Sequence, residues 1–212
     1  MPSVDRGSRS KDALLDAAER LIAERGFEVP LRDIAQAAGQ RNNSAVNYHF
    51  RSRQDLVDAV VGRRLLPMEL ERERMLAELD ADDAGDVHAL MRILVLPLLR
   101  LESTHYARFL QVVGTRLRTE PHHSAETAWP RVLDALSHAV PVSARGTRRR
   151  RVAAVATAMF ALAAEHERSC QDGTGADDPE EIVHMLAAML TATSSTTSST
   201  PLRVTTPDSG SP

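Results

Sequence analysis

The chain has 212 residues, of which 42% are hydrophobic and 26% charged, and its formal net charge at pH 7 is −3. It can hold one large domain or two small ones, since domains commonly have roughly 100–150 residues. No apolar run approaches the roughly 20 residues of a membrane-spanning helix. The single cysteine, Cys170, excludes an intramolecular disulfide framework, and residues 1–10 lack the apolar core of a secretory signal. We therefore expect a cytoplasmic protein without a membrane partner.

Charge is divided unevenly along the chain. Residues 1–64 hold eleven Lys and Arg against nine Asp and Glu, a net charge of +2, and the remainder holds fifteen against twenty, a net charge of −5. The negative total is no argument against nucleic-acid binding, because phosphate is bound by a local positive face.

The amino-terminal region predicts two helices separated by a tight turn. Ser10 can cap the first helix, and Gly26 can supply the left-handed residue that ends it. Pro30 suits the first turn of the second helix, where its missing N–H is no loss, and Gly39 stops that helix after about two turns. The apolar residues at helical spacing are Leu14, Ala18, Leu21 and Ile22 in the first helix, and Leu31, Ile34, Ala35 and Ala38 in the second.

A third short helix and a longer fourth helix follow. Asn42 or Asn43 can cap the third, which reaches about His49. Ser52, with Asp55 three residues later, resembles a capping box for the fourth, which extends to about residue 79. Two short helices joined by a glycine-containing turn are typical of a helix-turn-helix, whose second helix enters the major groove of DNA.

The segment around the third helix carries side chains suited to DNA. Residues 39–53 contain three arginines and no acid. The short side chains at residues 42–44 can hydrogen-bond base edges, and asparagine can pair with adenine through two hydrogen bonds. Tyr48, Arg51 and Arg53 are better placed for phosphates, and Arg41 can do either. A purely structural interpretation is also open, in which the asparagines only cap a helix and Tyr48 belongs to the core.

Ordered motifs over residues 10–62 add specificity. They are Ala18 and Leu21, Arg25-Gly26-Phe27, Leu31-Arg32-Asp33-Ile34-Ala35, Ala37-Ala38-Gly39, Ala45-Val46-Asn47-Tyr48-His49-Phe50 and Ser52-Arg53-Gln54-Asp55-Leu56. This series resembles the TetR family of transcriptional regulators. The resemblance implies phosphate contacts from Tyr48, His49 and Arg53, and suggests a further one from Arg32.

Three departures from the family pattern bear on this site. The family usually has threonine in place of Pro30, lysine in place of Arg53, and one residue fewer between Gly39 and Phe50. The longer turn leaves open which of residues 41–44 face the bases. The candidate DNA-binding residues are Arg32, Arg41, Asn42, Asn43, Ser44, Asn47, Tyr48, His49, Arg51 and Arg53.

The remaining sequence predicts further helices to about residue 191, with no convincing strand. Nine of the ten residues 191–200 are Ser or Thr, a composition that cannot bury enough apolar surface to offset its ordering entropy. We expect an all-α fold with a flexible arm at residues 1–9 and a three-helix helix-turn-helix DNA-binding domain at residues 10–62. A larger helical effector-binding and dimerisation domain at residues 63–191, which the resemblance implies, and a disordered Ser/Thr/Pro-rich tail at residues 192–212 complete it.

Two further sites are predicted in the larger domain. An apolar pocket with a few polar groups would suit a small organic effector, although ordinary helix packing also explains such residues. The candidates for this pocket are Met91, Leu94, Leu98, His105, Tyr106, Phe109, Val113, Arg116 and Trp129. The last two long helices have alanine-rich apolar faces that, if the resemblance holds, pair with a second copy, although part of them must close the domain's own core. The candidate dimer residues are Val152, Val155, Ala156, Met159, Phe160, Ala163, Ile182, Met185, Leu186 and Met189.

Catalytic and metal functions have little support in the sequence. His122-His123 with Glu126, or His166 with Cys170, have spacings that could hold a metal, but no third ligand is linked to them and no nucleophile or phosphate-loop motif is present. We expect no enzyme, no metal and no cofactor.

The function we predict is that of a homodimeric, ligand-responsive regulator. It would bind a near-palindromic operator in double-stranded DNA, most simply as a repressor that a small organic effector releases. The alternatives are a constitutive DNA-binding protein without an effector, and an all-α enzyme or adaptor with a vestigial helix-turn-helix.

Overall fold

The computed structural model describes residues 3–40, 44–80, 85–116, 127–140, 145–175 and 178–192, and these residues form helices and connecting turns without a strand. The all-α prediction is confirmed. The elements are α1 (Ser3–Arg25), α2 (Leu31–Ala37), α3 (Ser44–His49), α4 (Arg53–Ala77), α5 (Val87–Leu99), α6 (Tyr106–Val113), the 3₁₀ turn η2 (Gly114–Arg116), α7 (Ala128–Ala139), α8 (Arg145–Asp172) and α9 (Pro179–Thr191).

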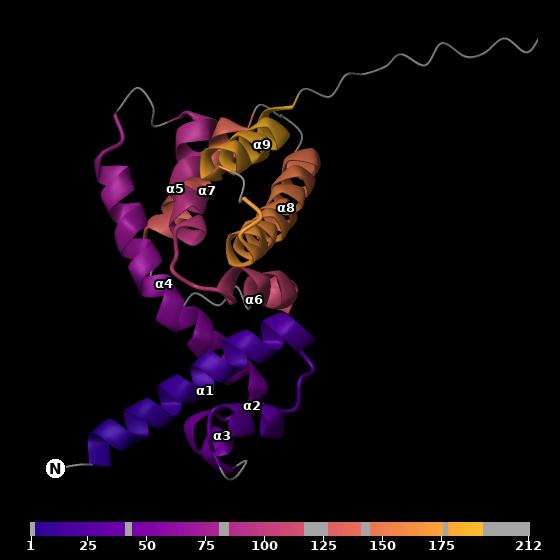
Figure 1. Cartoon of the computed structure of the whole chain (residues 1–212). Helices are drawn as coiled ribbons and strands as arrows, with labels where there is room; N and C mark the ends of the chain where they lie inside the picture. The colour runs from indigo at the N-terminus through magenta and orange to yellow at the C-terminus, as the bar shows by residue number, and fades with distance from the viewer. Residues whose placement is uncertain are drawn as a thin grey trace, which may run out of the picture.

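Figure 1 shows two groups of helices with α4 running between them. Helices α1, α2 and α3 lie together at one end, and α5, α7, α8 and α9 form a bundle at the other. Helix α6 lies between the groups and packs against both α1 and α8. None of the helices within the described ranges is both long and apolar enough to cross a membrane.

Helix α1 begins earlier than the sequence pattern predicted. It starts at Ser3, so Ser10 lies within the helix and does not cap it, and the predicted flexible arm of residues 1–9 is helical from Ser3 onward. The prediction was wrong because periodicity reports burial, and a polar helical segment gives no such signal. Gly7, the poorest helix former in this segment, costs only about 1 kcal/mol relative to alanine.

The predicted helix boundaries around the turn are confirmed with one adjustment. Gly26 and Gly39 have φ angles of +87° and +71°, which side chains other than glycine rarely adopt. Pro30 precedes α2 as its N-cap residue, with an extended ψ of 138°, and is not in the first turn. Ser52 caps α4, and its Oγ accepts a hydrogen bond of 3.0 Å from the Asp55 N–H.

Two apolar cores hold the molecule together, and one of them crosses the predicted domain boundary at residue 62. The first core combines Leu14 and Ile22 of α1 and Ile34 of α2 with Tyr106 and Phe109 of α6. The second core joins α5, α7, α8 and α9. The amino-terminal helices therefore share a core with α6, so a displacement of α6 would change the packing of α1.

Tyr106 makes this shared core sensitive to alkaline pH. It is 1% exposed, and burial raises its pKa above the ordinary value of 10.0. The unfolded chain would lose this proton near pH 10 while the folded chain keeps it. Stability is therefore fully present below about pH 10 and should fall above it by about 1.4 kcal/mol per pH unit from this group.

We expect Tyr106→Phe to remove this share of the alkaline destabilisation, as measured by urea unfolding between pH 9 and pH 11. The background is small, because the chain has only one lysine, Lys11, and one further tyrosine, Tyr48. Tyr48 is 84% exposed, so Tyr48→Phe is the matched control and should unfold like the unmodified chain. Equal pH dependence of Tyr106→Phe and the unmodified chain would show that Tyr106 ionises in the folded state.

Candidate nucleic-acid interface

Helices α2 and α3 are oriented by a small set of apolar side chains. Ile34 and Ala35 of α2, with Val46 and Phe50 at i, i+4 spacing at α3, are buried in the first core. The opposite side of α3 is left facing outward, with Asn47 and Tyr48 exposed. Figure 1 shows α3 at the end of the molecule away from α9, where a duplex could approach it.

Exposed polar groups surround this face of α3. Arg32 on α2 is exposed, and its Nε donates a 3.4 Å hydrogen bond to the carboxylate of the neighbouring Asp33. Arg51 is exposed just beyond α3. The half-buried His49 ring meets the Tyr48 ring edge to face, with centroids 5.0 Å apart. Arginine, amide and phenol side chains are therefore exposed on and near α3, and such groups contact phosphates and bases in DNA complexes.

Arg53 has a structural role that the sequence did not reveal. Its Nη1 donates to the backbone carbonyls of Phe27 and Val29, both at 2.7 Å, and its guanidinium lies 5.5 Å from the centre of the Phe27 ring. These contacts tie the start of α4 to the turn between α1 and α2. Its assignment as a phosphate contact stays a prediction, because part of its hydrogen-bonding capacity is already used.

The segment with the strongest base-reading chemistry is residues 41–44. Arg41, Asn42 and Asn43 lie outside the described residues, and Ser44 opens α3 with its side chain outside the description. Which of these residues would face the bases therefore stays a prediction.

The predicted pocket residues do not line one common cavity. Met91 and Leu94 are buried in the second core, and Trp129 is half-buried against it. Four others are buried in the first core: Leu98, Tyr106, Phe109 and Val113. Arg116 lies with its guanidinium 4.7 Å from the Phe27 ring, on the turn after α1. In the sequence, apolar residues at helical spacing look the same whether they line a pocket or pack into separate cores.

A cleft of about 850 Å³ opens elsewhere, between the amino-terminal helices and the bundle. Its walls come from α1, α2, α4, the segment joining α5 to α6, and α8, and they include Leu98 and His105 from the predicted pocket. No local sequence signal marks this cleft, because its walls come from segments far apart in the chain.

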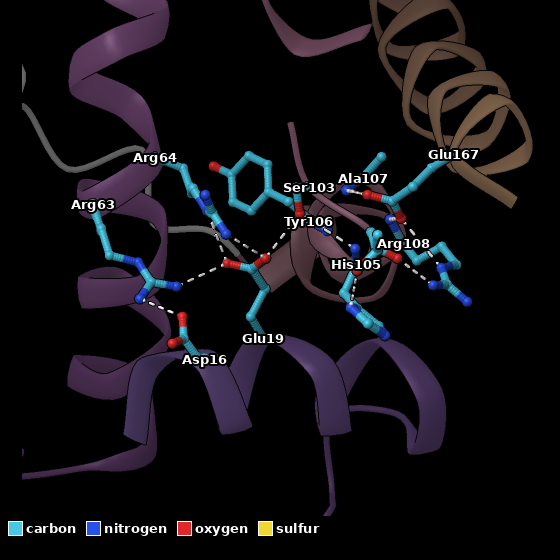
Figure 2. Close-up of polar contacts among 11 residues, drawn as sticks. Asp16, Glu19, Arg63, Arg64, Ser103, His105, Tyr106, Ala107, Arg108 and Glu167 are labelled. Carbon is cyan, nitrogen blue, oxygen red and sulfur yellow. Dashed lines mark hydrogen bonds and ion pairs between the residues drawn. The ribbon is translucent and has the colours of Figure 1, made fainter. Parts of the chain in front are cut away.

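A polar network spans the cleft region (Figure 2). Glu19 of α1 is 4% exposed and accepts hydrogen bonds from Arg63 at 3.1 Å and from Arg64 at 3.0 Å, both on α4. The hydrogen bond between Arg64 and Glu19 is the first cause of a raised pKa for Arg64. Glu19 also accepts from the Ser103 hydroxyl at 3.0 Å.

The same network caps the start of α6. Ser103 Oγ accepts from the Tyr106 N–H at 3.0 Å, and the carboxylate of Glu167 on α8 accepts from the N–H groups of Ala107 and Arg108 at 3.0 and 3.1 Å. The first N–H groups of a helix have no partner within it, so these side chains satisfy them. Helix α6 is thereby tied by hydrogen bonds to both α1 and α8.

The predicted dimer residues divide into three groups. Val155, Met159, Ala163, Ile182 and Leu186 are buried within their own chain, so the prediction was wrong for these. Val152 and Phe160 are half-buried, and the exposed members are Ala156, Met185 and Met189. The buried residues belong to the domain's own core. A sequence pattern marks an apolar helix face but does not tell whether the same chain or a second copy covers it.

The two metal candidates of the sequence differ in what the structure describes of them. His122, His123 and Glu126 lie outside the described residues. Across the described part of the chain, no group of three or more His, Cys, Asp or Glu side chains could hold a metal ion. His166 Nε2 instead lies 3.7 Å from Cys170 Sγ.

Comparisons with known proteins bear on the amino-terminal helices. Residues 14–60 match the model of the bacterial regulatory proteins, tetR family. Among solved structures, "a putative transcriptional regulator from Rhodococcus sp. RHA1" is 22% identical, with 85% of this chain and 95% of that chain covered and a TM-score of 0.42. No curated protein matches the chain. The matched residues hold the outward-facing α3 and the helices that position it, and residues 14–60 are thus a DNA-binding domain of the kind found in the bacterial regulatory proteins of the tetR family.

Proposed function

We propose that the chain acts as a homodimeric repressor that a small organic effector releases from a near-palindromic operator. The observation that carries this proposal is the exposed face of α3, with Tyr48, Asn47 and the neighbouring Arg51 directed outward from a buried support. Such a helix reads about one half-site, so two copies roughly 34–36 Å apart would contact two half-sites one helical turn apart. Like other regulators of bacterial transcription, the protein would act in the cytoplasm.

The dimer part of the proposal rests on the exposed apolar residues of the bundle. Ala156 on α8 and Met185 and Met189 on α9 are exposed, and α8 packs against α9. A second copy covering these residues would bring two long helices from each chain together. The symmetry of such a pair would match the symmetry of a palindromic site.

The effector part of the proposal rests on how the two helix groups are joined. An effector shifts an equilibrium only by its differential affinity for two conformers, so it must prefer a conformer that does not fit DNA. Helix α4 runs from Arg53 to Ala77 and contacts α1, α5 and α7. A change in its tilt would alter the distance between the two reading helices of a dimer.

A constitutive DNA-binding protein is the second candidate, and one observation favours it. Most of the residues predicted to line an effector pocket fill two packed cores. A response of the single tryptophan, Trp129, to a broad metabolite panel would favour the effector-responsive function. No change of Trp129 fluorescence with any metabolite of the panel, together with specific DNA binding, would favour a constitutive DNA-binding protein.

The test of DNA binding is selection of bound fragments from sheared genomic DNA of the source organism at two salt concentrations. Recovery of a palindromic motif that binds more weakly at high salt is the expected result, because neutralised phosphates release counterions. Recovery of a non-palindromic motif would contradict the dimer, and recovery of no motif would contradict sequence-specific regulation.

Arg32 provides a direct test of the phosphate contacts. We expect Arg32→Ala to weaken binding to all sequences and to reduce the slope of log affinity against log salt by about 1, because one fewer phosphate is neutralised. Its side chain is 77% exposed, so stability should change by less than about 0.5 kcal/mol. Fluorescence anisotropy of labelled DNA at several salt concentrations measures the slope.

The matched control is Arg131→Ala on α7, where the same charge is removed from the bundle. It should leave the salt slope unchanged, and an Arg32→Ala slope that equals the Arg131→Ala slope would remove Arg32 from the interface. Arg53→Ala is a less clean test, because loss of its bonds to the carbonyls of Phe27 and Val29 would also loosen the turn before α2.

A further inference from the structure

The cleft between the amino-terminal helices and the bundle has the dimensions of a ligand site. Its volume of about 850 Å³ lies within the roughly 300–1,000 Å³ of known small-molecule pockets. Much of its wall is made of short or apolar side chains. These are Ala13, Ala17, Ala37, Ala38, Leu98, Leu99, Leu101, Ala107 and Ala163.

The two buried carboxylates of the cleft wall, Glu19 and Glu167, are already paired, whereas Asp16, Arg20 and Glu102 of the same wall keep contact with solvent. Glu19 is paired with Arg63 and Arg64, and Glu167 is paired with Arg108 at 3.2 Å. A charged ligand in the buried part of the cleft would have to displace one member of such a pair from its partner, which leaves a charge without compensation. An uncharged molecule meets no such cost.

One polar group in this wall lacks a partner. His166 is 9% exposed, and its Nδ1 has no hydrogen-bond partner among the described residues. Its other ring nitrogen, Nε2, has the Cys170 thiol at 3.7 Å, a weak partner. A buried polar atom without a partner is costly, so a conformer that gives Nδ1 a hydrogen bond gains stability. A slight opening of the cleft would allow a ligand to supply that bond.

We propose that this cleft is the effector site, and that it takes an uncharged, largely apolar organic molecule whose hydrogen-bonding group pairs with His166. The proposal rests on the effector-responsive function above and gives it a location and a ligand class. An occupant would touch α1 on one side and α8 on the other. It would strain the hydrogen bonds of Glu19 to Ser103 and of Glu167 to α6, and so change the position of α3.

Cys170 allows this proposal to be tested without knowledge of the natural ligand. It is the single cysteine of the chain, it is exposed, and it lines the cleft. Monobromobimane attached to its Sγ places an uncharged, apolar bicycle with carbonyl acceptors beside His166. We expect a blue-shifted bimane emission relative to bimane on free cysteine, and DNA affinity lowered roughly 5–150-fold, the usual range of allosteric coupling.

Three controls isolate the effect of an occupant. The Cys170→Ser variant treated with the same reagent should keep its DNA affinity. Carbamidomethylation by iodoacetamide, which adds a much smaller group, should change affinity little. In labelled protein, His166→Ala should shift the emission to the red, whereas His138→Ala, on α7 and outside the cleft wall, should not.

The outcomes separate this proposal from the proposed function. Emission equal to that of bimane on free cysteine would show that the cleft does not accept the group, and a blue shift with unchanged DNA affinity would show that the cleft does not regulate. Either result overturns the proposal while the unlabelled chain still binds DNA. Failure of the unlabelled chain to bind any DNA would instead overturn the proposed function.

Discussion

Glu69→Gln is expected to lower the free energy of unfolding by about 3–5 kcal/mol, because it leaves a buried arginine without its counter-charge. Arg72 is 2% exposed, and its Nη1 donates to Glu69 Oε1 at 2.7 Å. Burial lowers the pKa of Arg72 below its ordinary value, and the hydrogen bond to Glu69 opposes this shift. Arg72 also donates to the Leu94 carbonyl at 3.1 Å and lies 4.8 Å from the centre of the Trp129 ring.

Glutamine keeps the shape of the side chain but cannot replace both carboxylate oxygens. Glu69 Oε2 accepts from the Trp129 N–H at 3.1 Å, so the carboxylate also caps the start of α7. An amide has one acceptor and one donor group, so either Arg72 or Trp129 would face an N–H group. Fluorescence of Trp129 during urea unfolding measures the change in the free energy of unfolding, because Trp129 contacts both Arg72 and Glu69.

Glu73→Gln is the matched control, since it lies one turn further along the same helix. Glu73 pairs with Arg131 at 3.0 Å, with side chains 42% and 54% exposed, and exposed pairs contribute about 0.2–1 kcal/mol. The double variant Glu69→Leu with Arg72→Met should be less destabilised than Glu69→Gln, because it removes both charges. A loss for Glu69→Gln no larger than that of Glu73→Gln would show that Arg72 is solvated in the folded chain.

Glu19→Gln is expected to cost about 2–4 kcal/mol and to loosen the amino-terminal helices from the rest of the chain. Its carboxylate joins α1 to Arg63 and Arg64 of α4 and to Ser103 before α6. The cost should be smaller than for Glu69, because both arginines keep 26% of their side-chain surface in water. Calorimetry should show a transition that precedes the unfolding reported by Trp129.

Asp16→Asn is the control for Glu19, one turn earlier on α1. Asp16 pairs with Arg63 at 2.7 Å but keeps 67% of its side chain exposed, so its replacement should cost less than about 1 kcal/mol. Glu19→Gln with a single transition, at the midpoint of the Asp16→Asn variant, would contradict a role for Glu19 in joining the helix groups.

Three charged residues at helical spacing from apolar residues could have been predicted as buried from the sequence. Glu19 follows Leu15 at i+4, Arg72 follows Met68, and Glu167 follows Ala163, and each lies on the buried side of its helix. The spacing identifies such a residue as buried, but it does not identify the partner. Apart from Glu69, which lies three residues before Arg72 on the same helix, the partners come from other segments, between 22 and 84 positions away in the chain.

The sequence by itself determined the local features of this protein. The glycine stops at Gly26 and Gly39, the cap at Ser52, the all-helical fold and the helix-turn-helix follow from φ preferences, capping and periodicity, which act within a few residues. Tertiary structure alone decided that α6 shares a core with α1, that Arg53 binds the turn before α2, and that a cleft lies between α1 and α8. These features depend on which helices pack against each other through their apolar faces, and many different pairings of helices are compatible with the same sequence pattern.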